Sequence, residues 1–89
     1  MSDSMQLVVY TLDLCPNCEL LKDFLSSKGA DYIERNMMSA EAMTELRLKG
    51  VFVQEAPVLQ VGEQFFTTKE LFPGNSLNEE FVSGVISGA

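Results

Sequence analysis

Cys15 and Cys18 are the two cysteines of this 89-residue chain, and two residues separate them in the stretch LDLCPNCEL. A C-x-x-C pair can bind a metal ion, close a structural disulfide or exchange disulfides with another protein. Exchange needs a nucleophilic thiolate and a second thiol that resolves the mixed disulfide. The spacing alone leaves all three chemistries open, so the flanking residues must separate them.

Pro16 follows the first cysteine directly, and proline is favoured at the first position of a helix. We therefore predict a helix that begins at Pro16, with Cys15 as its N-cap and Cys18 in its first turn. The free backbone N–H groups and the helix dipole at this end stabilise a thiolate. The pattern predicts that Cys15 attacks a substrate disulfide and that the more shielded Cys18 resolves the mixed disulfide.

Charged residues of both signs surround the motif and have opposite effects on the pKa of the Cys15 thiol. Lys22 lies one turn beyond Cys18 on the same helix face, where its charge would contribute about 0.4–1.7 kcal/mol to a Cys15 thiolate, unless Lys22 is only a solvated residue. The neighbouring acids raise a thiol pKa, and they are Asp13, Glu19 and Asp23. With Lys22 counted, the segment 13–23 has a net charge of −2. We therefore expect Lys22 and Asp13 to tune the Cys15 pKa to a modestly lowered value, in a couple that donates electrons.

Alternating predicted strands and helices surround the motif. The run QLVVYTL has little alternation, which is typical of a strand buried on both faces. Gly62 and Glu63 form a two-residue turn between two apolar runs. The expected strands are 6–12, 31–36, 58–61 and 64–67. Three helices are expected. The first begins at Pro16 and turns an apolar stripe inward, made of Leu20, Leu21, Phe24 and Leu25. The second has Ser39 as its N-cap and runs to about Lys49, and the third spans 77–87.

This order, βαβαββα, predicts a small α/β domain. The first strand–helix–strand unit implies a parallel pair with a right-handed crossover, and the last two strands form an antiparallel hairpin. We expect a four-stranded mixed sheet flanked by three helices, in one domain that spans residues 1–89.

Composition sets the class of protein and of partner. Apolar residues make up 46% of the chain, which allows a core, and the net charge of −7 disfavours nucleic acid and anionic membranes. The start, MSDSMQ, lacks the basic residues of a secretory signal, and no apolar run approaches a membrane span. We expect a cytoplasmic monomer, and in the cytosol a C-x-x-C pair indicates redox or metal chemistry.

A metal or iron–sulfur carrier is the main alternative from another class. Two thiolates per chain are too few for a closed four-ligand site, and the chain has no histidine. A dimer would supply four cysteines, so this alternative requires two chains. A coloured dimer after aerobic purification would favour the carrier, and a colourless monomer would favour the redox protein.

Pro57 is the second informative position. A proline that opens a strand donates no hydrogen bond, and the Ala56–Pro57 bond is compatible with either a cis or a trans form. In the cis form, Ala56 would offer its backbone N–H and C=O to an extended peptide beside Cys15. Asn17 lies at the tip of the motif, where it could donate a hydrogen bond to a partner. We expect substrate contacts from Pro16, Asn17, Ala56 and Pro57.

The stretches VVYTLDLCPNCELLK and QEAPVLQVGEQFF together resemble the glutaredoxin-like branch of the thioredoxin fold. The resemblance spans about residues 6–86 and depends on Cys15, Cys18, Lys22 and Pro57. It implies a dithiol–disulfide oxidoreductase whose Cys15–Cys18 disulfide is the redox centre, with no other cofactor. It also implies that Pro57 is cis and packs against the cysteines.

The departures from the family pattern concern glutathione. Glutathione-using members commonly carry a basic residue before the motif, an aromatic residue inside it and a Gly-Gly turn after the hairpin. This chain has Asp13, Asn17 and the stretch FFTTKELF instead, where Thr67, Thr68 and Glu70 are the available polar groups. An acidic site without these donors should bind an anionic tripeptide poorly, although a glutathione-dependent glutaredoxin remains the alternative.

The stretch VQEAPVLQVGEQFF is closer to the NrdH-type redoxins, although their aromatic-Ser-Gly-Phe-Arg-Pro tail is missing. That resemblance implies a disulfide-bearing protein substrate such as ribonucleotide reductase. The candidate reductants are a flavin thioredoxin reductase, a ferredoxin-linked thiol reductase and glutathione, of which glutathione is not favoured.

Overall fold

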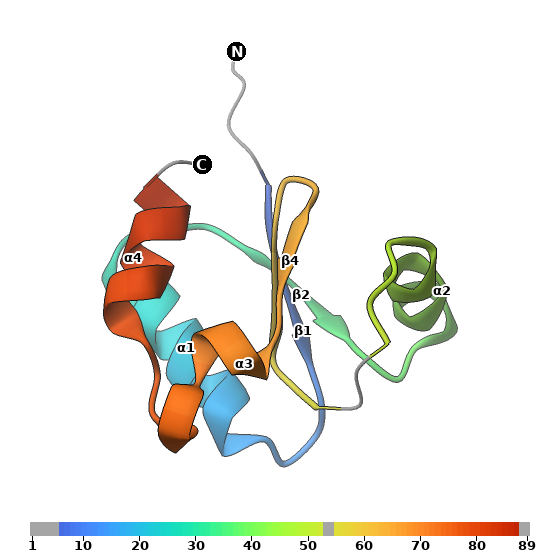
Figure 1. The fold of residues 1–89 in the computed structure, drawn as a ribbon, viewed down its shortest axis with the longest axis horizontal. Helices are drawn as coiled ribbons and strands as arrows, with labels where there is room; N and C mark the ends of the chain where they lie inside the picture. Colours follow the sequence, from blue (N-terminus) through green and yellow to red (C-terminus); the bar gives the residue numbers. More distant parts are fainter. Residues whose placement is uncertain (1–5, 53–54, 88–89) are drawn as a thin grey trace.

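The computed structural model describes residues 6–52 and 55–87 of the chain. Figure 1 shows a central sheet with helices on both sides. In chain order the elements are β1 (Leu7–Thr11), α1 (Pro16–Ser27), β2 (Ile33–Asn36), α2 (Ala40–Leu48), β3 (Val58–Val61), β4 (Gln64–Phe66), α3 (Thr68–Leu71), the 3-10 helix η1 (Pro73–Asn75) and α4 (Glu79–Ser87).

The sheet has four strands in the order β2-β1-β3-β4. Strands β1 and β2 are parallel, whereas β3 pairs antiparallel with both β1 and β4. The predicted mixed sheet, its parallel first pair and its terminal hairpin are therefore confirmed. Gly62 has a φ of 62° in the hairpin turn, in the left-handed region that glycine adopts readily.

Strand β1 is buried on both faces, as its unbroken apolar sequence predicted. Leu7 and Val9 join a core with residues of α1, α3 and α4, while Val8 and Tyr10 join a second core with residues of α2. Figure 1 shows the same division, with α2 alone on one side of the sheet. The motif follows β1 directly, so its place depends on a strand that both cores hold in position.

The chain between the hairpin and the last helix is more regular than its sequence indicated. Strand β4 ends at Phe66, and α3 and η1 follow it in a stretch where no helix was expected. The Thr67 backbone N–H donates to the Glu70 carboxylate at 2.8 Å, and the Thr67 hydroxyl donates to the same oxygen at 3.1 Å. This pairing satisfies a free N–H group at the helix start and explains why the helix forms there.

One core assignment from the sequence is wrong. Leu20 was grouped with the inward stripe of the first helix, but its side chain is 50% exposed, whereas Leu21 and Leu25 are fully buried. Helix α1 packs one narrow face against the sheet, and Leu20 lies outside that face. None of the helices within 6–52 and 55–87 is both long and apolar enough to cross a membrane.

Candidate active site

The N-terminus of α1 holds the two cysteines. Cys15 is the N-cap, with an extended backbone (φ −118°, ψ 96°), and Pro16 occupies the first turn. The Cys15 sulfur accepts a hydrogen bond from the Cys18 backbone N–H at 3.1 Å. This geometry is the one that the sequence predicted, and a donor aimed at sulfur favours its negatively charged form.

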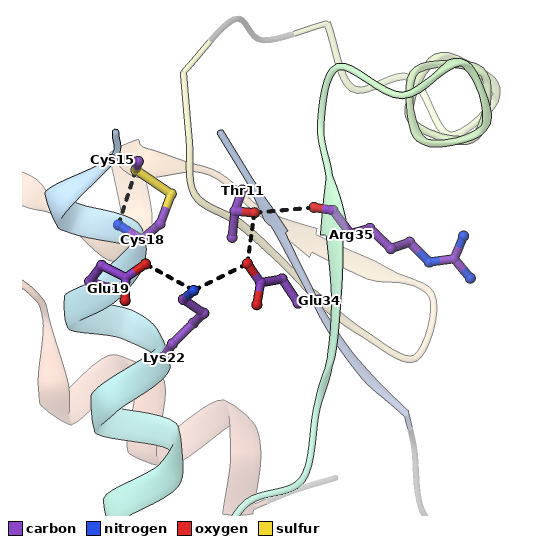
Figure 2. The surroundings of a disulfide bond; sticks show 7 residues. All are labelled: Thr11, Cys15, Cys18, Glu19, Lys22, Glu34 and Arg35. Carbon is purple, nitrogen blue, oxygen red and sulfur yellow. Dashed lines mark hydrogen bonds and ion pairs between the residues drawn. A yellow bond between two sulfur atoms is a disulfide. The ribbon is translucent and has the colours of Figure 1, made fainter. Parts of the chain in front are cut away.

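The two sulfurs form a disulfide, with the Cα atoms 5.2 Å apart. Cys18 is 1% exposed, while Cys15 is partly exposed. The difference in exposure supports attack by Cys15 and resolution by Cys18, because an incoming disulfide can reach only the exposed sulfur. Figure 2 shows the pair at the end of α1, with the N–H bond to Cys15.

Leu14, directly before the nucleophile, has an unusual conformation. Its φ is +55°, in the left-handed region that bulky residues rarely adopt, and its side chain is 100% exposed. Nothing in the sequence indicated this, because leucine has no preference for positive φ. An exposed apolar side chain held beside a reactive sulfur is well placed to contact a partner.

A groove of about 770 Å³ lies over Cys15. Pro16, Asn17 and Ala56, three of the four expected substrate contacts, line it. Its charged lining residues are Asp13, Glu55 and Lys69, and α3 and η1 form one wall. Sequence reasoning missed Lys69 because it follows the last expected strand, in a stretch that was assigned to no element.

The Ala56–Pro57 peptide bond is cis, as the family resemblance implied and as the sequence alone left open. Pro57 is fully buried, whereas Ala56 is partly exposed on the groove wall. Pro57 is therefore not among the residues that line the groove, and its expected packing against the cysteines stays a prediction.

Lys22 makes its polar contacts with two carboxylates. Its Nζ lies 2.9 Å from Glu19 Oε2 and 3.1 Å from Glu34 Oε2 (Figure 2). The hydrogen bonds that the Lys22 ammonium donates to Glu19 and then to Glu34 raise its pKa. The expectation that Lys22 and Asp13 tune the thiol pKa stays a prediction. Sequence reasoning did not identify Glu34 as a partner of Lys22.

The polar side chains after the hairpin are used within the protein. The Thr68 hydroxyl donates to Glu55 Oε1 at 2.8 Å, and the Glu70 carboxylate accepts from Thr67. The backbone hydrogen bond from Thr67 holds the pKa of Glu70 below its ordinary value. A glutathione molecule would have to displace these bonds to use the same groups.

Metal binding finds no support from side-chain clusters. Across 6–52 and 55–87, His, Cys, Asp and Glu residues do not gather in any group of three or more that could hold a metal ion. The carrier alternative would therefore need ligands from a second chain, as its two cysteines already required.

Comparison with known proteins places this geometry in context. The family model for glutaredoxin matches residues 7–66. A solved structure of NrdH-redoxin from Escherichia coli, described as a glutaredoxin-like protein with a thioredoxin-like activity profile, superposes with a TM-score of 0.59 at 26% identity. The match covers 71% of this chain and 82% of that one, and it confirms the thioredoxin-like fold. A search of curated proteins finds no match.

Proposed function

Because the chain belongs to the glutaredoxin family, we propose that this dithiol oxidoreductase reduces disulfides of a partner protein through Cys15 and Cys18. The observation that carries the proposal is the asymmetry of the pair. Cys15 is the partly exposed N-cap that accepts a hydrogen bond at 3.1 Å, and Cys18 is its buried neighbour. One sulfur is therefore suited to attack and the other to internal resolution.

In the first step, the Cys15 thiolate attacks one sulfur of the substrate disulfide. A bond forms between Cys15 and that sulfur, the substrate S–S bond breaks, and the other substrate sulfur leaves as a thiolate that takes up a proton. The Cys18 N–H and the helix N-terminus stabilise the thiolate before attack.

In the second step, Cys18 loses its proton and its thiolate attacks the Cys15 sulfur. The Cys15–Cys18 bond forms, the mixed disulfide breaks, and the second substrate sulfur leaves as a thiol after protonation. The substrate gains two electrons and two protons, and the redoxin ends as the disulfide seen in the structure. A dithiol reductant then returns two electrons to the pair.

The proposed direction is electron donation. Asp13 and Glu55 face the groove, and Glu19 and Glu34 flank Lys22 beside the pair. This excess of negative charge disfavours thiolate and therefore the dithiol form, which makes the couple more reducing. A cytosolic location, where thiols are kept reduced, fits this direction.

The likeness to NrdH-redoxin supports a reductase-coupled donor, with ribonucleotide reductase as the proposed type of target. The groove supports the same preference over glutathione, because its lining includes Asp13 and Glu55 with Lys69 as the cation. Glutathione carries two carboxylates and would meet this lining with little charge complementarity.

Reduction of insulin disulfides, measured with each reductant in turn, tests the proposal. We expect turnover with a flavin thioredoxin reductase or a ferredoxin-linked reductase, and slow turnover with glutathione as the only donor. Cys15→Ser serves as the inactive control. Rapid turnover with glutathione alone would show that the reductant is assigned wrongly.

A Cys18→Ser variant tests the order of attack separately. It should accumulate a mixed disulfide between Cys15 and the substrate, because the resolving thiol is absent. A Cys15→Ser variant should form none. Accumulation on Cys18 instead would reverse the proposed roles.

A further inference from the structure

Neighbouring residues of β2 point to opposite sides of the sheet and form two separate ion pairs. Glu34 points toward α1, where its Oε2 lies 3.1 Å from Lys22 Nζ, while Arg35 lies 3.9 Å from Glu45 Oε1 of α2. Figure 2 shows the Glu34 side chain on the side of the disulfide and the Arg35 side chain directed away from it. One strand thus carries a pair beside the redox centre and a matched pair remote from it.

Glu34 is anchored on its own side of the sheet. The Thr11 hydroxyl, at the end of β1, donates to Glu34 Oε2 at 3.2 Å, the same oxygen that contacts Lys22. Thr11 is buried, and its backbone is fixed by the β1–β2 pairing that places it opposite Asn36. The Glu34 side chain is 47% exposed, and the hydrogen bond from Thr11 ties its carboxylate to the end of β1.

Lys22 lies one helical turn beyond Cys18, about 6 Å farther along the helix axis. Its side chain is 16% exposed, and both of its ion pairs are with carboxylates, Glu19 and Glu34. Within 6–52 and 55–87, its hydrogen bonds reach oxygen and none reaches a sulfur atom. The cation nearest to the cysteines on this helix is thus committed to other partners.

We propose that Glu34 is a positioning residue that holds the Lys22 ammonium away from the Cys15–Cys18 pair and thereby makes the couple more reducing. The inference deepens the proposed function, since it concerns regulation of the same dithiol. With Glu19, the two carboxylates outnumber the one ammonium and leave a net negative charge beside the thiols. That charge disfavours the thiolate, and the disulfide form gains relative to the dithiol form.

Other groups also influence the thiol pKa values of the pair, and substitution of Glu34 leaves those groups in place. Asp13, Glu55 and Lys69 face Cys15 from the groove. The Cys18 N–H and the helix N-terminus have the opposite effect to the acidic residues, because they stabilise the thiolate. We therefore expect the Glu34→Gln substitution to shift the dithiol–disulfide equilibrium and not to abolish the redox activity of the pair.

The size of the shift follows from the charge removed. A unit charge on the order of 8 Å from a sulfur, at an effective dielectric constant between about 40 and 80, changes the thiolate population about 2- to 6-fold. The same factor in the exchange equilibrium corresponds to about 9–23 mV for this two-electron couple.

The test is the equilibrium between Cys15–Cys18 and a dithiothreitol redox buffer, measured for wild type and Glu34→Gln. Glutamine keeps an oxygen that can accept from Thr11 and removes the charge. We expect the equilibrium to move about 2- to 6-fold toward the dithiol at about pH 9, where the thiolate is populated. The difference between the two proteins should be smaller at about pH 6, because a smaller fraction of the thiols is ionised there. No shift at the higher pH would overturn the proposal.

Glu45→Gln is the matched control, because it breaks the ion pair with Arg35 on the other side of the same strand. It should leave the equilibrium unchanged at both pH values. An equal shift in Glu45→Gln would show a general charge or stability effect and would overturn the role of Glu34. Thermal unfolding of each oxidised protein verifies that the compared variants are folded.

A Lys22→Met background tests whether Glu34 acts through the lysine. With Lys22 present, Glu34→Gln both removes a negative charge and frees the ammonium, so its effect should be larger than in the Lys22→Met background. Equal shifts in the two backgrounds would mean that Glu34 acts only through its own negative charge, which would contradict the positioning role. Because the redox buffer replaces every protein partner, these results do not depend on which reductase or substrate the proposed function names.

Discussion

Leu14 offers a prediction in which stability and activity should change independently. Its backbone has φ +55° and its side chain is fully exposed, so the folded protein bears a conformational cost without a compensating buried contact. A left-handed non-glycine residue costs about 1–2 kcal/mol, and glycine loses about 0.5–1 kcal/mol through greater freedom in the unfolded chain. Leu14→Gly should therefore stabilise the oxidised protein by about 0.5–1 kcal/mol.

Leu14→Ala is the control, because it removes the same apolar side chain and keeps the strained backbone. Its stability should stay within about 0.5 kcal/mol of wild type, since an exposed side chain is lost. For a chain of this size, the expected gain in Leu14→Gly is an increase in Tm of about 2–8 °C. Thermal and urea unfolding of the oxidised proteins measure the difference. A Gly variant no more stable than the Ala variant would refute the argument from backbone strain.

The same two variants test whether Leu14 contacts the substrate. Both should lose about 5-fold in kcat/KM for insulin disulfides, which corresponds to about 1 kcal/mol of transition-state contact. Neither variant should differ from wild type in kcat/KM for a small disulfide that is too short to reach the Leu14 side chain. Equal losses for both substrates would place the effect on the thiols themselves.

Further predictions concern the thiols, the α3 cap and the core. In the reduced protein, Cys15 should be alkylated about tenfold or more faster than Cys18, which is 1% exposed, as mapped by peptide mass spectrometry. Glu70→Gln should lower the free energy of unfolding at neutral pH, because the folded-state pKa of Glu70 lies below its ordinary value of 4.5. This stabilisation is fully present above about pH 5 and is lost as the pH falls through the folded pKa, so the difference between the two proteins in urea unfolding should shrink as the solution is acidified. Leu21→Ala, in the fully buried face of α1, should cost about 2–5 kcal/mol of unfolding free energy.

Local signals in the sequence were sufficient for the core of the site. Pro16 marks a helix start, so the N-cap position of Cys15 and the depth of Cys18 followed from spacing alone. The apolar run of β1 indicated burial on both faces, and the two cores confirm it. These features depend on neighbours within a few residues, which a single sequence displays.

Features that depend on tertiary placement were missed. The pairing of Lys22 with Glu34 could not be predicted, because Glu34 lies on another element and the direction of its side chain depends on the register of β2. The pairing of Thr67 with Glu70 makes a helix directly after β4, where the sequence indicated no helix. Leu20 was assigned to the core because an apolar stripe can be wider than the face that the sheet covers.

The equilibrium reduction potential of the Cys15–Cys18 couple tests the central claim most directly. An N-cap thiol in an acidic setting predicts a reducing donor, with a potential below about −200 mV against a glutathione or dithiothreitol buffer at neutral pH. A value near about −120 mV, typical of a strong disulfide donor, would contradict the proposed direction of electron flow.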